Sequence, residues 1–234
     1  DMPYYYYGFD PTYVLVLIGA VICLIASARV KSTFNKYSRY RSMSGMTGAQ
    51  AAERILNSAG IYDVTVCHIS GSLTDHYNPV NKTINLSRDV YYGNSIAAAA
   101  VAAHETGHAL QHAKGYSMLK LRSTLVPAVE FASHWVQWIL LAGILMVNSF
   151  PGLLLVGIGL FAIMTLFSFV TLPVEIDASH RALAWLRNSG ITDYQTQGYA
   201  FDALKWAAYT YVIAALSSLA TLLYYIMIYL NRRD

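Results

Sequence analysis

Long apolar runs dominate the hydrophobic pattern of this chain. Uncharged apolar stretches cover residues 12–28, 135–148, 152–172 and 207–230. A helix rises about 1.5 Å per residue, so roughly 20 apolar residues cross the hydrocarbon core of a bilayer. The second and third runs are separated by Asn-Ser-Phe-Pro at 148–151, a turn sequence. The pattern predicts a mainly α membrane protein with about four transmembrane helices, two of which form a hairpin over residues 134–172.

The region between the first two spans contains short amphipathic segments instead of long apolar runs. Thr47 and Gln50 form a capping-box pattern that opens an amphipathic helix ending near Gly60. Residues 64–69 and 83–87 alternate between apolar and polar positions, as half-buried strands do. We expect residues 83–87 to be an edge strand that pairs with an extended peptide. The alternative, of equal weight, is that the two strands form a hairpin that only packs against a helix. This region is therefore predicted to be a small α+β domain.

Composition agrees with membrane insertion. Of the 234 residues 56% are hydrophobic, and the mean hydropathy is +0.38, which is high for a soluble protein. The two cysteines, Cys23 and Cys67, lie in dissimilar surroundings. They indicate neither a disulfide framework nor a thiolate metal site.

Basic residues are distributed unevenly along the chain. Residues 29–130 contain eleven Lys and Arg, residues 173–207 contain three, and the tail at 231–234 contains two. The positive-inside tendency places the first two groups in the cytoplasm and the N-terminus outside. The four tyrosines at 4–7 are expected in an aromatic belt at the outer membrane surface. The modest net charge of +3 favours membrane orientation over nucleic-acid binding.

The candidate chemistry begins at residues 104–108, which read His-Glu-Thr-Gly-His and match the pattern H-E-x-x-H. Asn94 and Ser95 are N-cap candidates before an alanine-rich run, so the motif is predicted to lie on a helix. Residues four apart share a helix face, and His104 and His108 can therefore bind one Zn²⁺ ion. Glu105 is placed to act as the general base toward water.

Other histidines are less suited to the same ion. On a continuing helix, His112 lies about 6 Å beyond His108, too far for a shared bond of about 2 Å. His68 and His76 are expected to be surface or hydrogen-bonding residues. A third ligand must therefore come from elsewhere in the chain.

Residues 173–182, at the return point of the hairpin, supply the best carboxylate. Pro173 suits the first turn of a new helix, and Glu175 is the preferred third ligand. Asp177 is the alternative ligand, although it also fits an ion pair with Arg181 or a hydrogen bond that orients a ligand histidine. Small residues at 178, 179 and 182 are expected to pack on the alanine-rich helix. Stabilisation of the oxyanion is open to His180, Arg181 and Tyr209.

Together these segments resemble the neutral zinc metallopeptidases of bacterial membranes, often called YugP-like peptidases. The resemblance rests on LTDHYNP at 73–79, AAHETGH at 102–108 and LPVEIDAS at 172–179, and it covers nearly the whole chain. It implies metal ligands at His104, His108 and Glu175. It also implies kinship with CAAX-protease and HtpX-type membrane peptidases, which have a gluzincin-like site at the cytoplasmic face. Those relatives usually have an aspartate where this chain has Ser179, which leaves the role of Asp177 open.

These inferences predict a membrane-anchored zinc metalloendopeptidase of the bacterial plasma membrane. Its partners would be the lipid bilayer and a peptide or membrane-protein substrate, with no nucleic acid and no oligomeric state indicated. Two alternatives are an intramembrane zinc protease and a non-catalytic scaffold stabilised by zinc. The predicted organisation is a tail at 1–11, a span at 12–28, a zincin-like cytosolic-face domain at 29–133, a hairpin at 134–172, a third-ligand helix and connector at 173–206, a span at 207–230 and a tail at 231–234.

Overall fold

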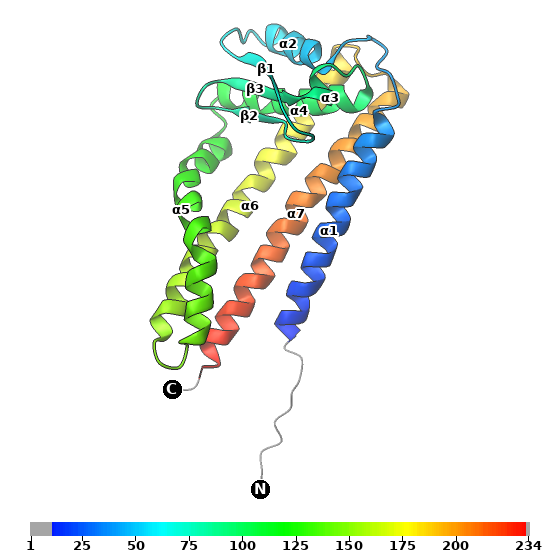
Figure 1. Cartoon of the computed structure of the whole chain (residues 1–234). Coiled ribbons are helices and arrows are strands. Elements are labelled where there is room, and N and C mark those ends of the chain that lie inside the picture. The colour runs from blue at the N-terminus through cyan, green and yellow to red at the C-terminus, as the bar shows by residue number, and fades with distance from the viewer. Residues whose placement is uncertain (1–10, 233–234) are drawn as a thin grey trace. The chain divides into compact units, whose positions relative to one another are not determined.

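Four long helices make up most of the protein. The structure is a computed structural model that describes residues 11–232. The long helices are α1 (Pro11–Tyr37), α5 (Ser117–Leu145), α6 (Pro151–Asn188) and α7 (Tyr194–Leu230) (Figure 1). Each is long and apolar enough to cross a membrane. The prediction of a mainly helical chain with about four candidate spans is confirmed.

All four helices extend beyond the apolar runs that predicted them. α1 continues through the basic residues to Tyr37, and α7 begins at Tyr194 instead of near residue 207. Pro173 was expected to begin a new helix, but it lies inside α6, so that prediction was wrong. Proline removes one backbone hydrogen bond, and the helix formers on both sides of it continue α6 across that gap.

The short elements all lie between α1 and α5 in sequence. Two predicted caps are present: Thr47 Oγ1 accepts a hydrogen bond from the Gln50 amide at 3.2 Å, and Gln50 Oε1 accepts one from the Thr47 amide at 3.0 Å. Ser95 Oγ accepts one from the Ala98 amide at 3.0 Å. These caps fix the first turns of two helices. The short elements are α2 (Gly48–Ser58), β1 (Thr65–Ile69), β2 (His76–Asn78), β3 (Thr83–Ser87), α3 (Arg88–Tyr91) and α4 (Ile96–Ala113).

The three strands form one sheet in the order β1-β3-β2. β3 pairs parallel to β1 and antiparallel to β2. The expectation that residues 83–87 form an edge strand was therefore wrong, because β3 is central, and Ile84 and Leu86 are fully buried. The three-residue strand β2, in a stretch rich in turn-forming residues, was not predicted and provides the missing neighbour. Since β1 and β3 are parallel, they are not the two arms of a hairpin either.

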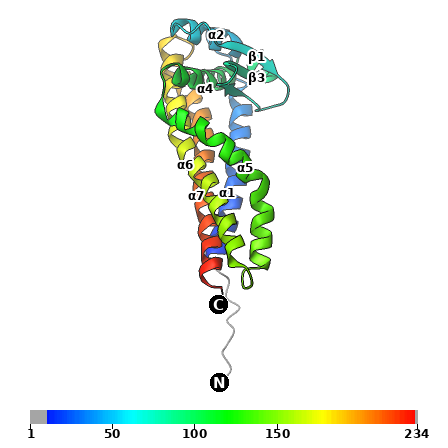
Figure 2. The ribbon, with the colours of Figure 1, turned by 90° about the vertical axis from the view of Figure 1, so that its left-hand side faces the viewer.

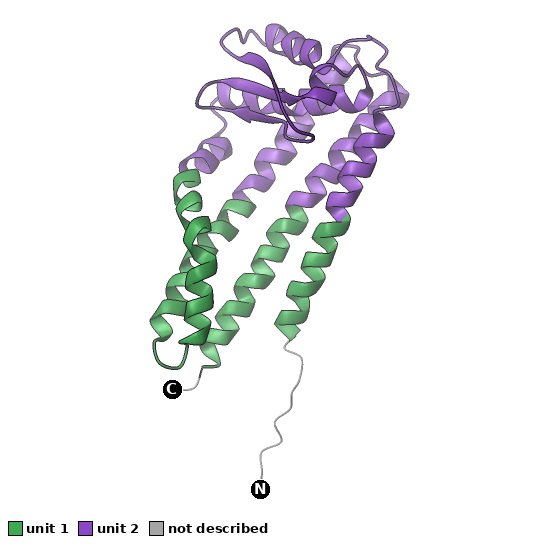
Figure 3. Ribbon diagram, in the orientation of Figure 1, with its two compact units in different colours: residues 1–25, 125–169, 212–234 green, residues 26–124, 170–211 purple. Residues whose placement is uncertain are grey.

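Contacts divide the chain into two compact units (Figure 3). Residues 26–124 and 170–211 form unit 2, purple in Figure 3, which is here called the site unit. In it α2 packs against α4 and β1, and the strands run alongside α4 (Figures 1 and 2). Its core joins Ile55 of α2, Ile84 and Leu86 of β3, and the small side chains of α4. This packing holds α4 beside the sheet.

The described residues 11–25, 125–169 and 212–232 belong to unit 1, green in Figure 3, which is here called the span unit. Its buried cluster is Val136, Leu140, Leu154 and Ile158. A Cβ on Gly143 would lie 2.6 Å from the Leu154 Cα atom, so glycine permits a close approach of α5 and α6. The tyrosines at 4–7, expected in an aromatic belt, and the last two residues of the tail lie outside the described residues.

Candidate metal centre

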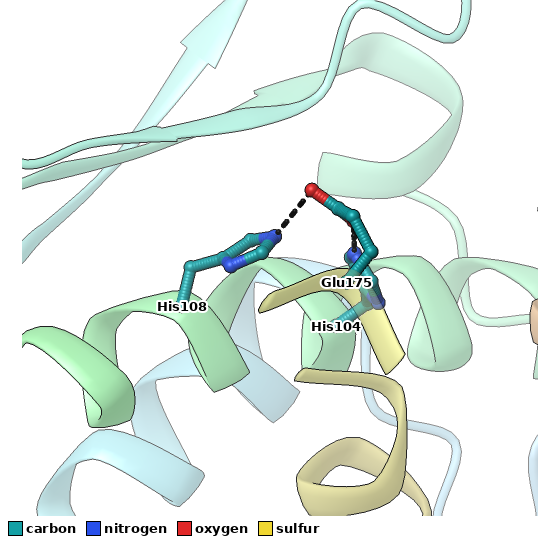
Figure 4. Close-up of side chains that lie close together, drawn as sticks. All are labelled: His104, His108 and Glu175. Atoms are coloured by element: carbon teal, nitrogen blue, oxygen red, sulfur yellow. Dashed lines mark hydrogen bonds and ion pairs between the residues drawn. The ribbon is translucent and has the colours of Figure 1, made fainter. Parts of the chain in front are cut away.

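Two histidines on α4 and one glutamate on α6 converge in the site unit. His104 and His108 are one turn apart, and their ring centroids are 4.9 Å apart. His104 Nε2 lies 2.9 Å from Glu175 Oε2, and His108 Nε2 lies 3.4 Å from Glu175 Oε1. Figure 4 shows both rings and the carboxylate meeting at one point. The structure therefore brings together the three residues that the sequence nominated as ligands.

Close packing of α4 on α6 makes this convergence possible. A Cβ on Gly107 would lie 2.7 Å from the Ala178 carbonyl oxygen, so glycine lets the two backbones approach. Ala178 and Ala182 are buried, as is the alanine-rich first half of α4. The small residues at 178, 179 and 182 were predicted to pack on α4, and the contact of Ala178 with Gly107 agrees with this. The sequence reasoning did not single out Gly107.

The outer ring nitrogens of both histidines are held by neighbouring side chains. Ser179 Oγ lies 2.9 Å from His104 Nδ1, and Gln111 Oε1 lies 3.0 Å from His108 Nδ1. When these oxygens accept from Nδ1–H, each Nε2 presents its lone pair to the common point. Ser179, four residues after Glu175 on α6, thus contacts the outer nitrogen of His104.

Two acceptors on α6 fix the orientation of the Gln111 side chain. It is fully buried, and its Nε2 donates at 2.8 Å to the Val174 carbonyl oxygen and at 2.8 Å to Asp177 Oδ2. Both partners are acceptors, so the amide must turn its Oε1 toward His108. Asp177 in turn accepts from Arg181 Nε at 2.6 Å. The expected i,i+4 pair is present, and Asp177 contacts Gln111, which in turn contacts His108.

Arg122 of α5 also reaches the centre. Its Nη1 lies 2.8 Å from Glu175 Oε1, and the Glu175 side chain is only 4% exposed. Sequence reasoning did not single out Arg122. A permanent cation close to apolar residues was the available signal, because such a residue is costly to bury without an acidic partner.

Glu105 is partly buried beside the two histidines. Burial raises the pKa of its carboxyl above the ordinary value of 4.5, while the charges of His104 and His108 pull in the opposite direction. Glu175 and Asp75 raise this pKa further through charge repulsion. Glu105 therefore lies within electrostatic reach of the whole centre.

The other nominated residues lie in different surroundings. His180 is exposed on α6. Tyr209 is 45% exposed and packs edge-on against Trp206, with ring centroids 5.5 Å apart. His112 bonds through Nδ1 to the Tyr77 hydroxyl at 2.7 Å, in agreement with the prediction that it is not a third ligand.

The donor set fits a zinc ion. The ligand atoms of His104, His108 and Glu175 all lie within 4.8 Å of one another. Two imidazole nitrogens and one carboxylate oxygen form the three-ligand set of catalytic zinc sites, which keep a further position open for water. Side chains already hold both outer nitrogens, as they do around metal-ligating histidines.

Comparison with known proteins agrees with this chemistry. The family model described as "Putative neutral zinc metallopeptidase" matches residues 12–230. The chain is 46% identical over 211 residues to a Bacillus subtilis (strain 168) protein named "Putative membrane protease YugP", with 89% of this chain and 92% of that protein covered. No solved structure matches the chain significantly. The resemblance seen in the sequence is thus confirmed, and the chain belongs to the neutral zinc metallopeptidase family.

Proposed function

We propose that this protein is a membrane-anchored zinc metalloendopeptidase. The observation that carries the proposal is the convergence of His104, His108 and Glu175, whose ligand atoms lie within 4.8 Å of one another. Glu105, the residue after the first histidine, adds a carboxylate that a purely structural site would not need. The family and the named relative support a peptidase, and the four apolar helices support membrane anchoring.

The chain's own residues have separate roles in this mechanism. When bound, zinc acts as a Lewis acid and lowers the pKa of water to about 7. His104, His108 and Glu175 would hold the ion. Ser179 and Gln111 would keep His104 and His108 in the tautomer that presents Nε2. Glu105 accepts the proton of the attacking water and then delivers it to the leaving amine.

We assign the substrate strand to β2 in place of β3. β1 and β2 are the two outer strands of the sheet, and of these β2 packs against α4, which carries the centre. An extended peptide that pairs with the outer side of β2 would lie along α4. Strand addition would hold the backbone of the substrate while the centre acts on one peptide bond.

The same reasoning supports a topology. Fourteen of the sixteen Lys and Arg lie in residues 29–130 and 173–207, which also contain the metal centre. By the positive-inside tendency these segments are cytoplasmic and the N-terminus is outside. The centre would then act at the cytoplasmic face of the bacterial plasma membrane.

The test compares wild type with Glu105→Gln, both purified in detergent, for zinc content and for cleavage of casein or a membrane-protein substrate. We expect one zinc per chain in both proteins and cleavage only by wild type. Full activity in Glu105→Gln would contradict the role of the base. Zinc in both proteins without cleavage in either would favour the scaffold alternative. Cleavage restricted to bonds within the bilayer would favour the intramembrane alternative.

A further inference from the structure

The structure assigns Arg122 as a positioning residue for the Glu175 carboxylate, and we propose that it prepares this group for zinc before the ion binds. Arg122 Nη1 lies 2.8 Å from Glu175 Oε1. This role rests on the proposed zinc site and belongs to a residue that lies outside the H-E-x-x-H motif and its glutamate partner.

Glu175 needs a permanent cation because its side chain is almost completely buried, at 4% exposure. An ionised carboxylate without a charged or hydrogen-bonding partner is strongly disfavoured in such a place. His104 and His108 cannot provide that charge in the metal-binding state, since a ligand histidine must be neutral at the nitrogen that binds the ion. A guanidinium group is always protonated in proteins, so Arg122 provides it whatever the state of the histidines.

The geometry leaves the other carboxylate oxygen directed at His104, while Oε1 also lies 3.4 Å from His108 Nε2. Arg122 bonds Oε1, whereas Oε2 lies 2.9 Å from His104 Nε2. A guanidinium donor restricts rotation of the carboxylate, which would otherwise be free to turn away from the two rings. Arg122 thus has the same relation to Glu175 that Ser179 has to His104 and Gln111 to His108. Each of the three ligands is oriented by a different neighbour.

The three neighbours come from different parts of the sequence. Gln111 lies on α4, Ser179 on α6 and Arg122 on the first turns of α5. Arg122 therefore adds a third helix to a centre whose ligands occupy only two. Its side chain is 29% exposed, so the guanidinium is partly screened by water and partly enclosed by protein.

The test measures zinc affinity by competition with a chelator in full-length detergent-purified protein. Loss of a neighbour that orients a ligand typically weakens metal binding about 10- to 100-fold. We expect that loss for Arg122→Gln and partial recovery for Arg122→Lys, which keeps the charge without the planar donor geometry. Lys120→Gln is the matched control, because Lys120 is exposed on the same helix and its removal deletes one positive charge. It should keep the wild-type affinity.

Activity at saturating zinc separates positioning from contact with substrate. A positioning residue predicts that excess zinc restores kcat of Arg122→Gln to near the wild-type value. Wild-type zinc affinity in Arg122→Gln would overturn the inference, and so would a rise in KM alone, which would indicate a substrate contact. Absence of zinc from wild type would instead contradict the proposed function. Thermal unfolding with zinc removed verifies that the variants are folded.

Discussion

A methyl group added at Gly107 should disrupt the metal centre although residue 107 contacts no metal. In the Gly107→Ala variant, the new Cβ would lie 2.7 Å from the Ala178 carbonyl oxygen and 3.2 Å from its Cα atom. Both atoms belong to the backbone of α6, so no side-chain rotation relieves the clash. The two helices must move apart.

The size of this movement follows from the contact distance. Ordinary van der Waals contact begins at 3.4 Å, so α4 and α6 must separate by roughly 0.7 Å near Ala178. Glu175 lies on the same helix, one turn before Ala178, and moves with it. Metal–ligand distances tolerate deviations of only about 0.2 Å. We therefore expect zinc affinity to fall at least 10-fold and unfolding free energy to fall by about 1–3 kcal/mol, as for overpacked cores.

The assay combines chelator competition for zinc with thermal unfolding in detergent. Gly198→Ala is the matched control, because Gly198 lies in helix α7 and a Cβ added there would have no neighbouring atom within 4 Å. Alanine at 198 relieves the entropic penalty of glycine inside a helix and should stabilise the protein by about 0.5–1 kcal/mol. Wild-type zinc affinity and stability in Gly107→Ala would refute the reasoning, because they would mean that α4 and α6 do not approach as closely as the structure has them.

Three further substitutions test the side chains that contact the ligand histidines and the N-cap of α2. Ser179→Ala removes the hydroxyl that lies 2.9 Å from His104 Nδ1. It should weaken zinc binding about 10-fold in chelator competition, with little change in the unfolding temperature of the metal-free protein. Unchanged zinc affinity would show that Ser179 does not orient His104. Gln111→Leu keeps the side-chain volume but leaves His108 Nδ1 and the Val174 carbonyl oxygen without their hydrogen-bond partner. It should therefore weaken zinc binding and reduce the free energy of unfolding by about 1–3 kcal/mol. A loss of stability no larger than that of Ser179→Ala would contradict the role of these hydrogen bonds. Thr47→Ala removes the N-cap of α2 and should reduce unfolding free energy by about 1 kcal/mol while zinc affinity stays at the wild-type value, which thermal unfolding and chelator competition measure separately.

The elements that sequence reasoning located correctly are those with a strong local signal. Apolar length alone identified the four candidate spans, and the capping box at Thr47 and the cap at Ser95 marked two helix starts. The spacing of His104 and His108 is likewise a local property, because any helix places residues four apart on one face. Glu175 could be nominated because it lies at the return point of the hairpin, beside small residues expected to pack on the alanine-rich helix.

The errors concern relations between segments distant in sequence. The alternation in residues 83–87 predicts a strand but does not determine which strands pair with it. β2 has only three residues, too few to give a recognisable pattern in the sequence. Helix ends were also misplaced, because proline at 173 and the polar residues after Tyr194 are tolerated once a long helix is established.

The side chains around the ligands were the hardest part of the centre to foresee. Arg122 lies 53 positions from Glu175 in sequence, and Ser179 lies 75 positions from His104. No periodicity connects such pairs, which meet only because α4, α5 and α6 pack together in the site unit. Gly107 is informative only when the helix opposite to it is known.

Zinc-edge X-ray absorption of the detergent-purified protein tests the central claim most directly. The proposed centre predicts one zinc per chain with a shell of nitrogen and oxygen atoms at about 2.0–2.2 Å, including two imidazole rings, and loss of this signal in Glu175→Ala. Sulfur scattering at about 2.3 Å, which would implicate Cys23 or Cys67, would contradict the assignment. An unchanged spectrum in Glu175→Ala, or no zinc in the wild-type protein, would contradict it as well.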